Sequence, residues 1–310
     1  QGTSSFVVIS FDDLISISNK TEFGLEKPAL KLSITCLGIK AKYPNWYPRK
    51  NIILLWEAVS SRLEAYNERI LYGCSMGGHA AIKFSALMQA STTISLCPQW
   101  SINPNICKEI NLGWSNFYND ATMGDMCIKL EDLGPRTFIL SDPYNETDQF
   151  HCQKILNISD SVSHIQTYYC EHNVAPVLAG TFNFSKILNF CRLDQVDQLA
   201  VFVSRIRRTH YFRKKALIER GIREKPSLTF DIAFRNATSD EHISDIIFKS
   251  NGRFSIVADE KLTQEEREKY FSSLINMERN FYKKFRMSIF LENSMRYTMG
   301  LFTEFGTRIY

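Results

Sequence analysis

Short apolar runs alternate with longer segments of helical spacing over the first two thirds of the chain. The runs are rich in valine, isoleucine, tyrosine and phenylalanine, which favour strands. They predict six strands, at residues 6–10, 33–37, 70–73, 93–97, 137–140 and 165–170. Helices are expected between them, at about residues 51–67, 76–88 and 148–156. This alternation is typical of the α/β class, with a mostly parallel sheet and crossover helices.

The strand pattern ends near residue 193. Beyond it, residues 196–208 and 264–285 carry apolar positions three and four residues apart, which indicates helices. We therefore predict an α/β domain over residues 1–193 and a smaller, mainly α-helical appendage over residues 194–310. A short strand at residues 254–258 is the one exception expected in the appendage.

Composition adds few constraints. With 310 residues and 44% hydrophobic content, the chain can build a substantial core. No apolar run approaches the roughly 20 residues that a membrane-spanning helix needs. The eight cysteines form no CxxC pair and no metal-ligand spacing. We favour free thiols in a reducing cytoplasm, with disulfides as the alternative. A leader preceding Gln1 is also possible and would change the expected location.

Residues 205–225 contain nine basic residues and two acidic ones. Such a segment can contact an acidic protein partner or an anionic surface, or it can be a solvated helix face. The formal net charge of the whole chain is only +4. That value gives no support to nucleic-acid binding.

The strongest local motif is Gly73-Cys74-Ser75-Met76-Gly77, which matches G-x-S-x-G. A strand is predicted before it and a helix after it, the context in which this motif presents a nucleophilic serine. The glycines leave room for a turn directly from strand to helix. The backbone amide of Met76, at the start of the helix, would face a developing oxyanion.

A serine nucleophile needs a base and an acid at later strand ends. Asp142 closely follows the run TFIL, and His172 closely follows the run IQTYYC. We predict these two residues as the acid and the base. Asp148 is the alternative acid, or else the N-cap of the helix that follows.

The chain resembles the α/β-hydrolase family in YGCSMGG, in SDPY after a strand and in the histidine of CEHN. The resemblance covers roughly residues 5–193. It implies a triad of Ser75, Asp142 and His172, with the amide of Met76 as one oxyanion donor. It also implies a second donor from the loop FDDL, either Phe11 or Asp12, although no HGGG-type loop is present.

Aromatic residues follow the same strand ends and predict a substrate pocket. Trp100 is the first candidate for contact with substrate, with Trp46 and Tyr144 beside it. The segment LCPQWSINP is similar to one in hydrolase-like proteins of bacterial surface-polysaccharide loci, which suggests an acylated carbohydrate. No phosphate loop, dinucleotide motif or metal cluster is evident, so no cofactor is expected.

These features predict a serine hydrolase, an esterase or deacylase that cleaves a carboxylic ester on a small molecule or carbohydrate. Two alternatives stay open. An acyltransferase would use the same triad with a hydroxyl acceptor in place of water. A non-catalytic module would use the hydrolase-like fold to bind a partner.

Overall fold

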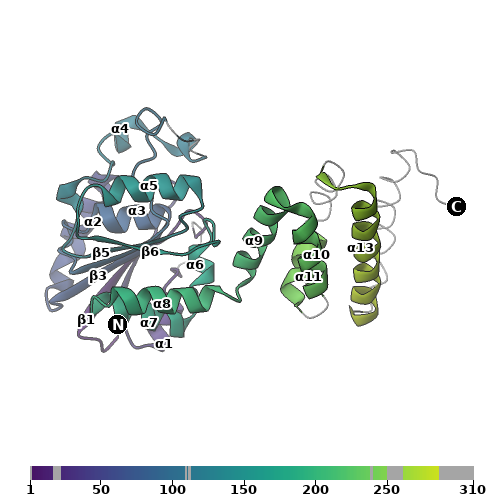
Figure 1. The fold of residues 1–310 in the computed structure, drawn as a ribbon. Coiled ribbons are helices and arrows are strands. Elements are labelled where there is room, and N and C mark those ends of the chain that lie inside the picture. Colours follow the sequence, from purple (N-terminus) through teal and green to yellow (C-terminus); the bar gives the residue numbers. More distant parts are fainter. Residues whose placement is uncertain are drawn as a thin grey trace. The chain divides into compact units, whose positions relative to one another are not determined.

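The computed structural model describes residues 2–16, 22–108, 110, 113–237, 240–249 and 261–285. It confirms the α/β class, because six parallel strands form one sheet in the order β2-β1-β3-β4-β5-β6 (Figure 1). The strands are β1 (Phe6–Phe11), β2 (Thr35–Ile39), β3 (Glu68–Cys74), β4 (Thr92–Leu96), β5 (Thr137–Ser141) and β6 (Val162–Gln166).

Strand order reverses beside β1. The chain adds β2 on one side of β1 and then crosses to the other side, where β3 to β6 follow in sequence. The connections that leave β1 and β3 therefore run in opposite directions. In open parallel sheets, such a switch point leaves a crevice outside the carboxyl ends of the two strands, where ligands bind.

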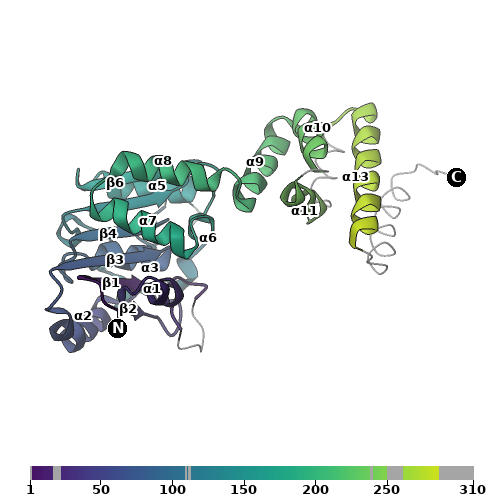
Figure 2. The ribbon, with the colours of Figure 1, turned by 90° about the horizontal axis from the view of Figure 1, so that it is seen from below.

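Helices cover both faces of the sheet. One face carries α1 (Glu26–Lys31), α7 (Thr181–Arg192) and α8 (Val196–Arg207) (Figures 1 and 2). The opposite face carries α2 (Arg49–Val59), α3 (Met76–Lys83) and α5 (Glu146–Leu156). Every residue of β1, β4 and β5 is buried, as expected for parallel strands covered on both sides.

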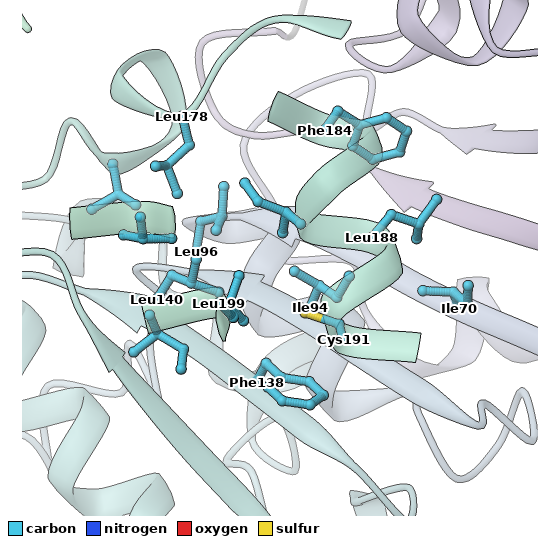
Figure 3. Packing of buried hydrophobic residues seen from close by; sticks show 14 of the residues in the cluster. Ile70, Ile94, Leu96, Phe138, Leu140, Leu178, Phe184, Leu188, Cys191 and Leu199 are labelled. Atoms are coloured by element: carbon cyan, nitrogen blue, oxygen red, sulfur yellow. The ribbon is translucent and has the colours of Figure 1, made fainter. Parts of the chain in front are cut away.

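The core on the α7 and α8 face is built from strand and helix residues together (Figure 3). Ile94 and Phe138 of the sheet pack in one cluster with Leu188 of α7 and with Leu199 and Val203 of α8. Because α8 buries its apolar stripe in this cluster, it belongs to the sheet domain. The compact unit runs to Ala216, beyond the boundary predicted near residue 193.

In its described residues, the connection between β4 and β5 holds three short helices: η2 (Ser115–Phe117), α4 (Asp120–Met123) and η3 (Leu130–Asp132). A buried ion pair ties it to α3, since Lys83 Nζ lies 2.8 Å from Asp132 Oδ2. The same ammonium donates to Cys127 O at 2.8 Å. We call this connection, residues 97–136, the β4–β5 insertion. The remaining short helices of the sheet unit are η1 (Ser60–Leu63) and α6 (Val174–Val177).

The second compact unit begins at Leu217, within α9 (Tyr211–Glu224). It continues through α10 (Pro226–Ala237), α11 (Glu241–Lys249) and α13 (Gln264–Phe285). Phe230 and Tyr270 pack at its centre, with ring centroids 4.5 Å apart. The helices predicted at residues 196–208 and 264–285 are confirmed as α8 and α13. The strand expected at residues 254–258 lies outside the described residues.

The basic segment 205–225 falls on the end of α8 and on α9. Two of its cations have partners within their own unit: Arg207 donates to Tyr168 O, and Arg220 pairs with Glu224. No partner molecule is shown for this segment. Across the described ranges, no helix combines the length and the apolar character needed to cross a bilayer.

Candidate active site

Ser75 lies in a sharp turn between β3 and α3. Its φ of 51° and ψ of −117° are rarely adopted by residues with a side chain. Strain of this kind persists only where the surroundings enforce it. Here the amide of Ser75 donates to Leu96 O at 2.8 Å, and its carbonyl accepts from the amide of His79 at 2.9 Å. The turn fixes the serine at the carboxyl edge of the sheet.

The glycines around Ser75 are required by close packing. A Cβ on Gly73 would lie 2.1 Å from Gly77 O, and a Cβ on Gly77 would lie 2.2 Å from Phe11 O. At Gly78 a Cβ would approach Ser95 Oγ to 2.7 Å. Side chains at these positions would force α3 away from the sheet. The strand-turn-helix arrangement expected for G-x-S-x-G is present.

The structure brings Ser75 and His172 together. His172 Nε2 lies 3.0 Å from Ser75 Oγ, and His172 Nδ1 lies 2.8 Å from Asp148 Oδ1. A carboxylate only accepts hydrogen bonds, so Nδ1 carries the proton and Nε2 presents a lone pair to the serine hydroxyl. The imidazole is therefore oriented to take the proton of Ser75.

The acid on His172 is Asp148, which corrects the predicted assignment of Asp142. Asn145 is the N-cap of α5, and its side chain accepts from the amide of Asp148 at 3.0 Å. Asp148 is thus the third residue of α5 rather than its cap. Its side chain is 1% exposed and reaches the imidazole from the first turn of the helix.

Asp142 binds backbone amides near the site instead of the imidazole. It is fully buried, and its Oδ1 accepts from the amide of Tyr144 at 3.0 Å. Its Oδ2 accepts from the amide of Glu171 at 2.7 Å. Glu171 adopts a φ of 51° directly before His172. Asp142 therefore positions the loop that carries the base, without contacting the imidazole.

The surroundings of His172 make it a stronger base. Burial lowers its pKa, but the hydrogen bond and the charge of Asp148 raise it, with a further contribution from the charge of Asp13. The net shift of the His172 pKa is upward. The imidazolium that forms on proton transfer is thus stabilised by a buried carboxylate.

Two more histidines lie near the site and stay neutral at pH 7. Burial lowers the pKa of His79 to about 4. Burial, together with the positive charges that His79 and His172 can carry, lowers the pKa of His151 to about 3. His79 Nδ1 lies 2.7 Å from Gln99 O, and since a carbonyl only accepts, that nitrogen carries the proton.

Of the three predicted oxyanion donors, only Met76 keeps a suitable amide. Met76 is the first residue of α3, where amides have no partner inside the helix. The amide of Asp12 instead donates to Ile39 O at 3.0 Å. Phe11 is the last residue of β1 and is paired with both neighbouring strands, so its amide belongs to the sheet. The loop after β1 therefore gives no second donor at Phe11 or Asp12.

The sequence gives no indication of Gln99, yet its side chain contacts Ser75. Its Nε2 lies 3.3 Å from Ser75 Oγ and 3.2 Å from Cys97 O. Its Oε1 accepts from Trp46 Nε1 at 3.0 Å. The residue is fully buried. Its position in the sequence, three residues after the end of β4, gives no signal beyond proximity to a strand end.

The three aromatic residues predicted to contact substrate, Trp46, Trp100 and Tyr144, do not line one common pocket in the described part of the structure. Trp46 is buried and donates to Gln99, while Trp100 donates to Ile128 O at 3.1 Å. Trp100 also packs against an apolar cluster formed mainly by α3, β5 and α5. Tyr144 is 45% exposed, against Tyr168. The aromatic side chain beside His172 is Trp114, whose ring centroid lies 5.5 Å from that of His172. Trp114 lies within the β4–β5 insertion, far beyond the end of β4 at Leu96, so the strand-end criterion does not predict it.

Among the described residues, one cluster has metal-ligating chemistry: Cys97, Asp148 and His172, whose ligand atoms lie within 4.8 Å of one another. Burial and the charge of Asp148 raise the pKa of the Cys97 thiol well above its ordinary value. A neutral thiol is a poor metal ligand. Because Nδ1 of His172 already donates to Asp148, this cluster fits a proton-transfer site better than a metal site.

Two cavities lie among the loops that follow the strands, and Ser75, His172 and Asp148 line neither of them. A pocket of about 200 Å³ lies at the carboxyl ends of β1 and β3 and is lined in part by Asp13, Cys74, Leu178 and Phe184. A larger groove of about 1090 Å³ lies between residues 43–54 and residues 116–125. The groove is adjacent to His172 through η2: the N-cap Trp114 contacts His172, while Asn116 and Phe117 line the groove.

Fold and site together define an α/β protein with a six-stranded parallel sheet and a hydrogen-bonded serine, histidine and aspartate at its carboxyl edge. Comparison with known families finds no family model that matches the chain, and comparison with curated proteins finds no matching sequence. The chemistry of the site therefore has to support any conclusion about function.

Proposed function

We propose that the protein is a serine hydrolase that cleaves carboxylic esters through an acyl-enzyme. The observation that carries this proposal is the continuous chain from Asp148 through His172 to Ser75, with both hydrogen bonds at 3.0 Å or less. The three residues come from separate segments after β5, β6 and β3. The nucleophile also sits in a strained turn, and such strain is concentrated at functional sites.

The geometry supports a specific sequence of steps. His172 Nε2 takes the proton of Ser75 as Oγ bonds to the ester carbonyl carbon, and the carbonyl electron pair moves onto oxygen. The amide of Met76 stabilises that oxyanion. Collapse breaks the bond to the alcohol, which leaves with the proton from His172. Water then attacks the acyl carbon and gives a proton to His172. Collapse breaks the bond between that carbon and Ser75 Oγ, which takes the proton back from His172 as the carboxylic acid leaves.

The resemblance to α/β-hydrolases supports the same proposal. Nucleophile, acid and histidine follow β3, β5 and β6 in the chain order serine, acid, histidine, which is the order typical of that family. The site also lies at the switch point of the sheet, where ligand sites of parallel α/β proteins form. Both features favour a catalytic site over a partner-binding surface.

An acylated carbohydrate with a short acyl group is the substrate class that we propose. The pocket of about 200 Å³ beside Cys74 is small for a ligand site and suits a short acyl chain. The groove of about 1090 Å³ suits the carbohydrate, since it combines the rings of Tyr43 and Phe117 with the amide groups of Asn45 and Asn116. Rings and amides together are suited to sugar faces and hydroxyl groups.

Labelling with a fluorophosphonate probe tests the proposal without a known substrate. We expect wild type to label on Ser75, as shown by peptide mapping, and Ser75→Ala and His172→Ala to remain unlabelled while keeping the wild-type circular dichroism spectrum. Hydrolysis of p-nitrophenyl acetate should follow the same pattern. Failure of the folded wild type both to label and to hydrolyse would exclude an activated serine at this site.

A further inference from the structure

Of the predicted oxyanion donors, the amide of Met76 alone remains assigned, because the amide of Asp12 donates to Ile39 O. We propose that Gln99 supplies the second donor through its side-chain amide, so that Nε2–H stabilises the oxyanion formed on Ser75. This role rests on the proposed hydrolase function. It is a catalytic role, since the amide contacts the reacting oxygen directly.

The orientation of the Gln99 amide follows from its partners. The indole of Trp46 can only donate, so the atom of Gln99 that faces it at 3.0 Å must be the oxygen. The NH₂ group then faces Cys97 O at 3.2 Å and Ser75 Oγ at 3.3 Å. Its two hydrogens match these two acceptors. One N–H is therefore directed at the nucleophile by the structure around it.

The surroundings also hold Gln99 in place. Its side chain is fully buried, and the backbone carbonyl of Gln99 accepts from Nδ1 of His79 at 2.7 Å. Trp46 and Cys97, which contact the amide, both have left-handed backbones, with φ of 48° and 46°. A donor fixed in this way needs no reorganisation when charge develops, which is the condition for strong oxyanion stabilisation.

The chemical step places charge within reach of this N–H. As Ser75 Oγ bonds to the carbonyl carbon, its proton goes to His172 and the carbonyl electron pair moves onto the oxygen, one atom away from Oγ. The N–H held 3.3 Å from Oγ in the free protein therefore lies beside this oxygen without rotation of the amide. Long contacts of this kind in unliganded sites often shorten in the transition state.

The test compares Gln99→Met with wild type, and with Gln153→Met as the matched control. Gln153 lies on the exposed face of α5, so the same chemical change is made outside the site. For hydrolysis of p-nitrophenyl acetate we expect Gln99→Met to lower kcat about 10²–10³-fold, the usual loss for one oxyanion donor. The control should keep wild-type kcat.

Two further readouts separate a catalytic role from a structural one. Benzeneboronic acid forms a tetrahedral adduct on an activated serine, and its affinity should fall in Gln99→Met in parallel with kcat. KM and the pH midpoint of kcat/KM should stay near wild type, because His172 is unchanged. Trp46→Phe removes the indole N–H that orients the amide but keeps the amide itself, so it should cost less, about tenfold in kcat.

A Gln99→Met protein that keeps kcat within about threefold of wild type would overturn the donor role. If this variant does not fold, Gln99→Glu tests the same role. The glutamate keeps an acceptor for Trp46 but places an oxygen, which cannot donate, beside Ser75. Wild-type kcat in Gln99→Glu at about pH 8 would equally overturn the role. A wild type that neither labels nor hydrolyses would instead refute the hydrolase function and, with it, this inference.

Discussion

Replacing Asp148 by asparagine should separate the acid of the site from the carboxylate that only supports it. Asp142→Asn is the matched control, since it makes the same chemical change at the other buried carboxylate. In Asp148→Asn, the new amide can donate to Nδ1 of His172. The imidazole proton then moves to Nε2, and His172 can no longer accept the proton of Ser75.

The structure allows the size of the effect to be worked out. Asp148 is 1% exposed and lies 2.8 Å from Nδ1, so water cannot replace it. Loss of the correct tautomer in such triads lowers kcat about 10⁴-fold, or about 5 kcal/mol at 25 °C. Asp142→Asn keeps one oxygen for the two amides of Tyr144 and Glu171, which should cost about 1.5–3 kcal/mol of folding stability.

The pH dependence gives a second, independent signature. A general base must be neutral, so the rate rises with pH through the pKa of His172. That pKa is raised in wild type, which places the midpoint above 6.5. Without the charge of Asp148, the opposing effect of burial prevails, and the midpoint of the residual rate should fall below 6.5. Asp142→Asn leaves these interactions in place and should keep the wild-type midpoint.

The assay is the rate of fluorophosphonate labelling against pH, with urea unfolding of the same proteins. We expect Asp148→Asn to be well folded and nearly inert, and Asp142→Asn to be less stable but to label with a wild-type pH midpoint. The reverse result, with Asp142→Asn inert and shifted in pH midpoint and Asp148→Asn unaffected, would show that the geometric assignment of the acid is wrong.

Three further predictions concern the surroundings of the site. Lys83→Met should lower the free energy of unfolding by about 3 kcal/mol, because it leaves Asp132 buried beside only a partly exposed Arg49, and adding Asp132→Asn should recover part of the loss in urea titrations. Stability should fall as the pH drops below about 6.5, since the buried, neutral His79 and His151 bind protons only on unfolding; at pH 5 each should cost about 2 kcal/mol, and His151→Leu should remove about half of this pH dependence in urea titrations. Among p-nitrophenyl esters, kcat/KM should be highest for the acetate and butyrate and fall steeply for the decanoate, and a preference for the decanoate would refute the short-acyl proposal.

The alternating pattern of the sequence predicts the sheet well but misplaces its last strand. The prediction was residues 165–170, whereas β6 spans Val162–Gln166. The aromatic and β-branched residues after Gln166 fit strand propensity, yet Tyr169 and Glu171 adopt positive φ. The buried carboxylate of Asp142 holds the amide of Glu171 in this turn. A long-range contact thus overrides local propensity, and no local pattern reports it.

The same reasoning explains which site residues the sequence could give. Ser75 and His172 follow from a local motif and from their positions after strands. Proximity to the strand end favours Asp142 as the acid, but the side chain that reaches His172 is Asp148, in the first turn of α5. Asn145, three residues before Asp148, is a recognisable N-cap and could have shifted the choice. Gln99 and Trp114 reach the site only through folding of the β4–β5 insertion.

Backbone strain connects these residues into one argument. Among the described residues, nine other than glycine have a positive φ, and six of them surround the site: Trp46, Tyr47, Ser75, Cys97, Tyr169 and Glu171. Each such conformation costs about 1–3 kcal/mol, so buried hydrogen bonds must enforce it. The contacts of Trp46 with Gln99 and of Asp142 with Glu171 do so, and both end at a group that faces Ser75 or carries His172. A fold selected only for stability would have little reason to gather this strain at one edge of the sheet. A site that must hold a proton acceptor and an oxyanion donor in fixed positions has that reason, which is why the Asp142 and Trp46 variants bear on the chemistry as well as on the fold.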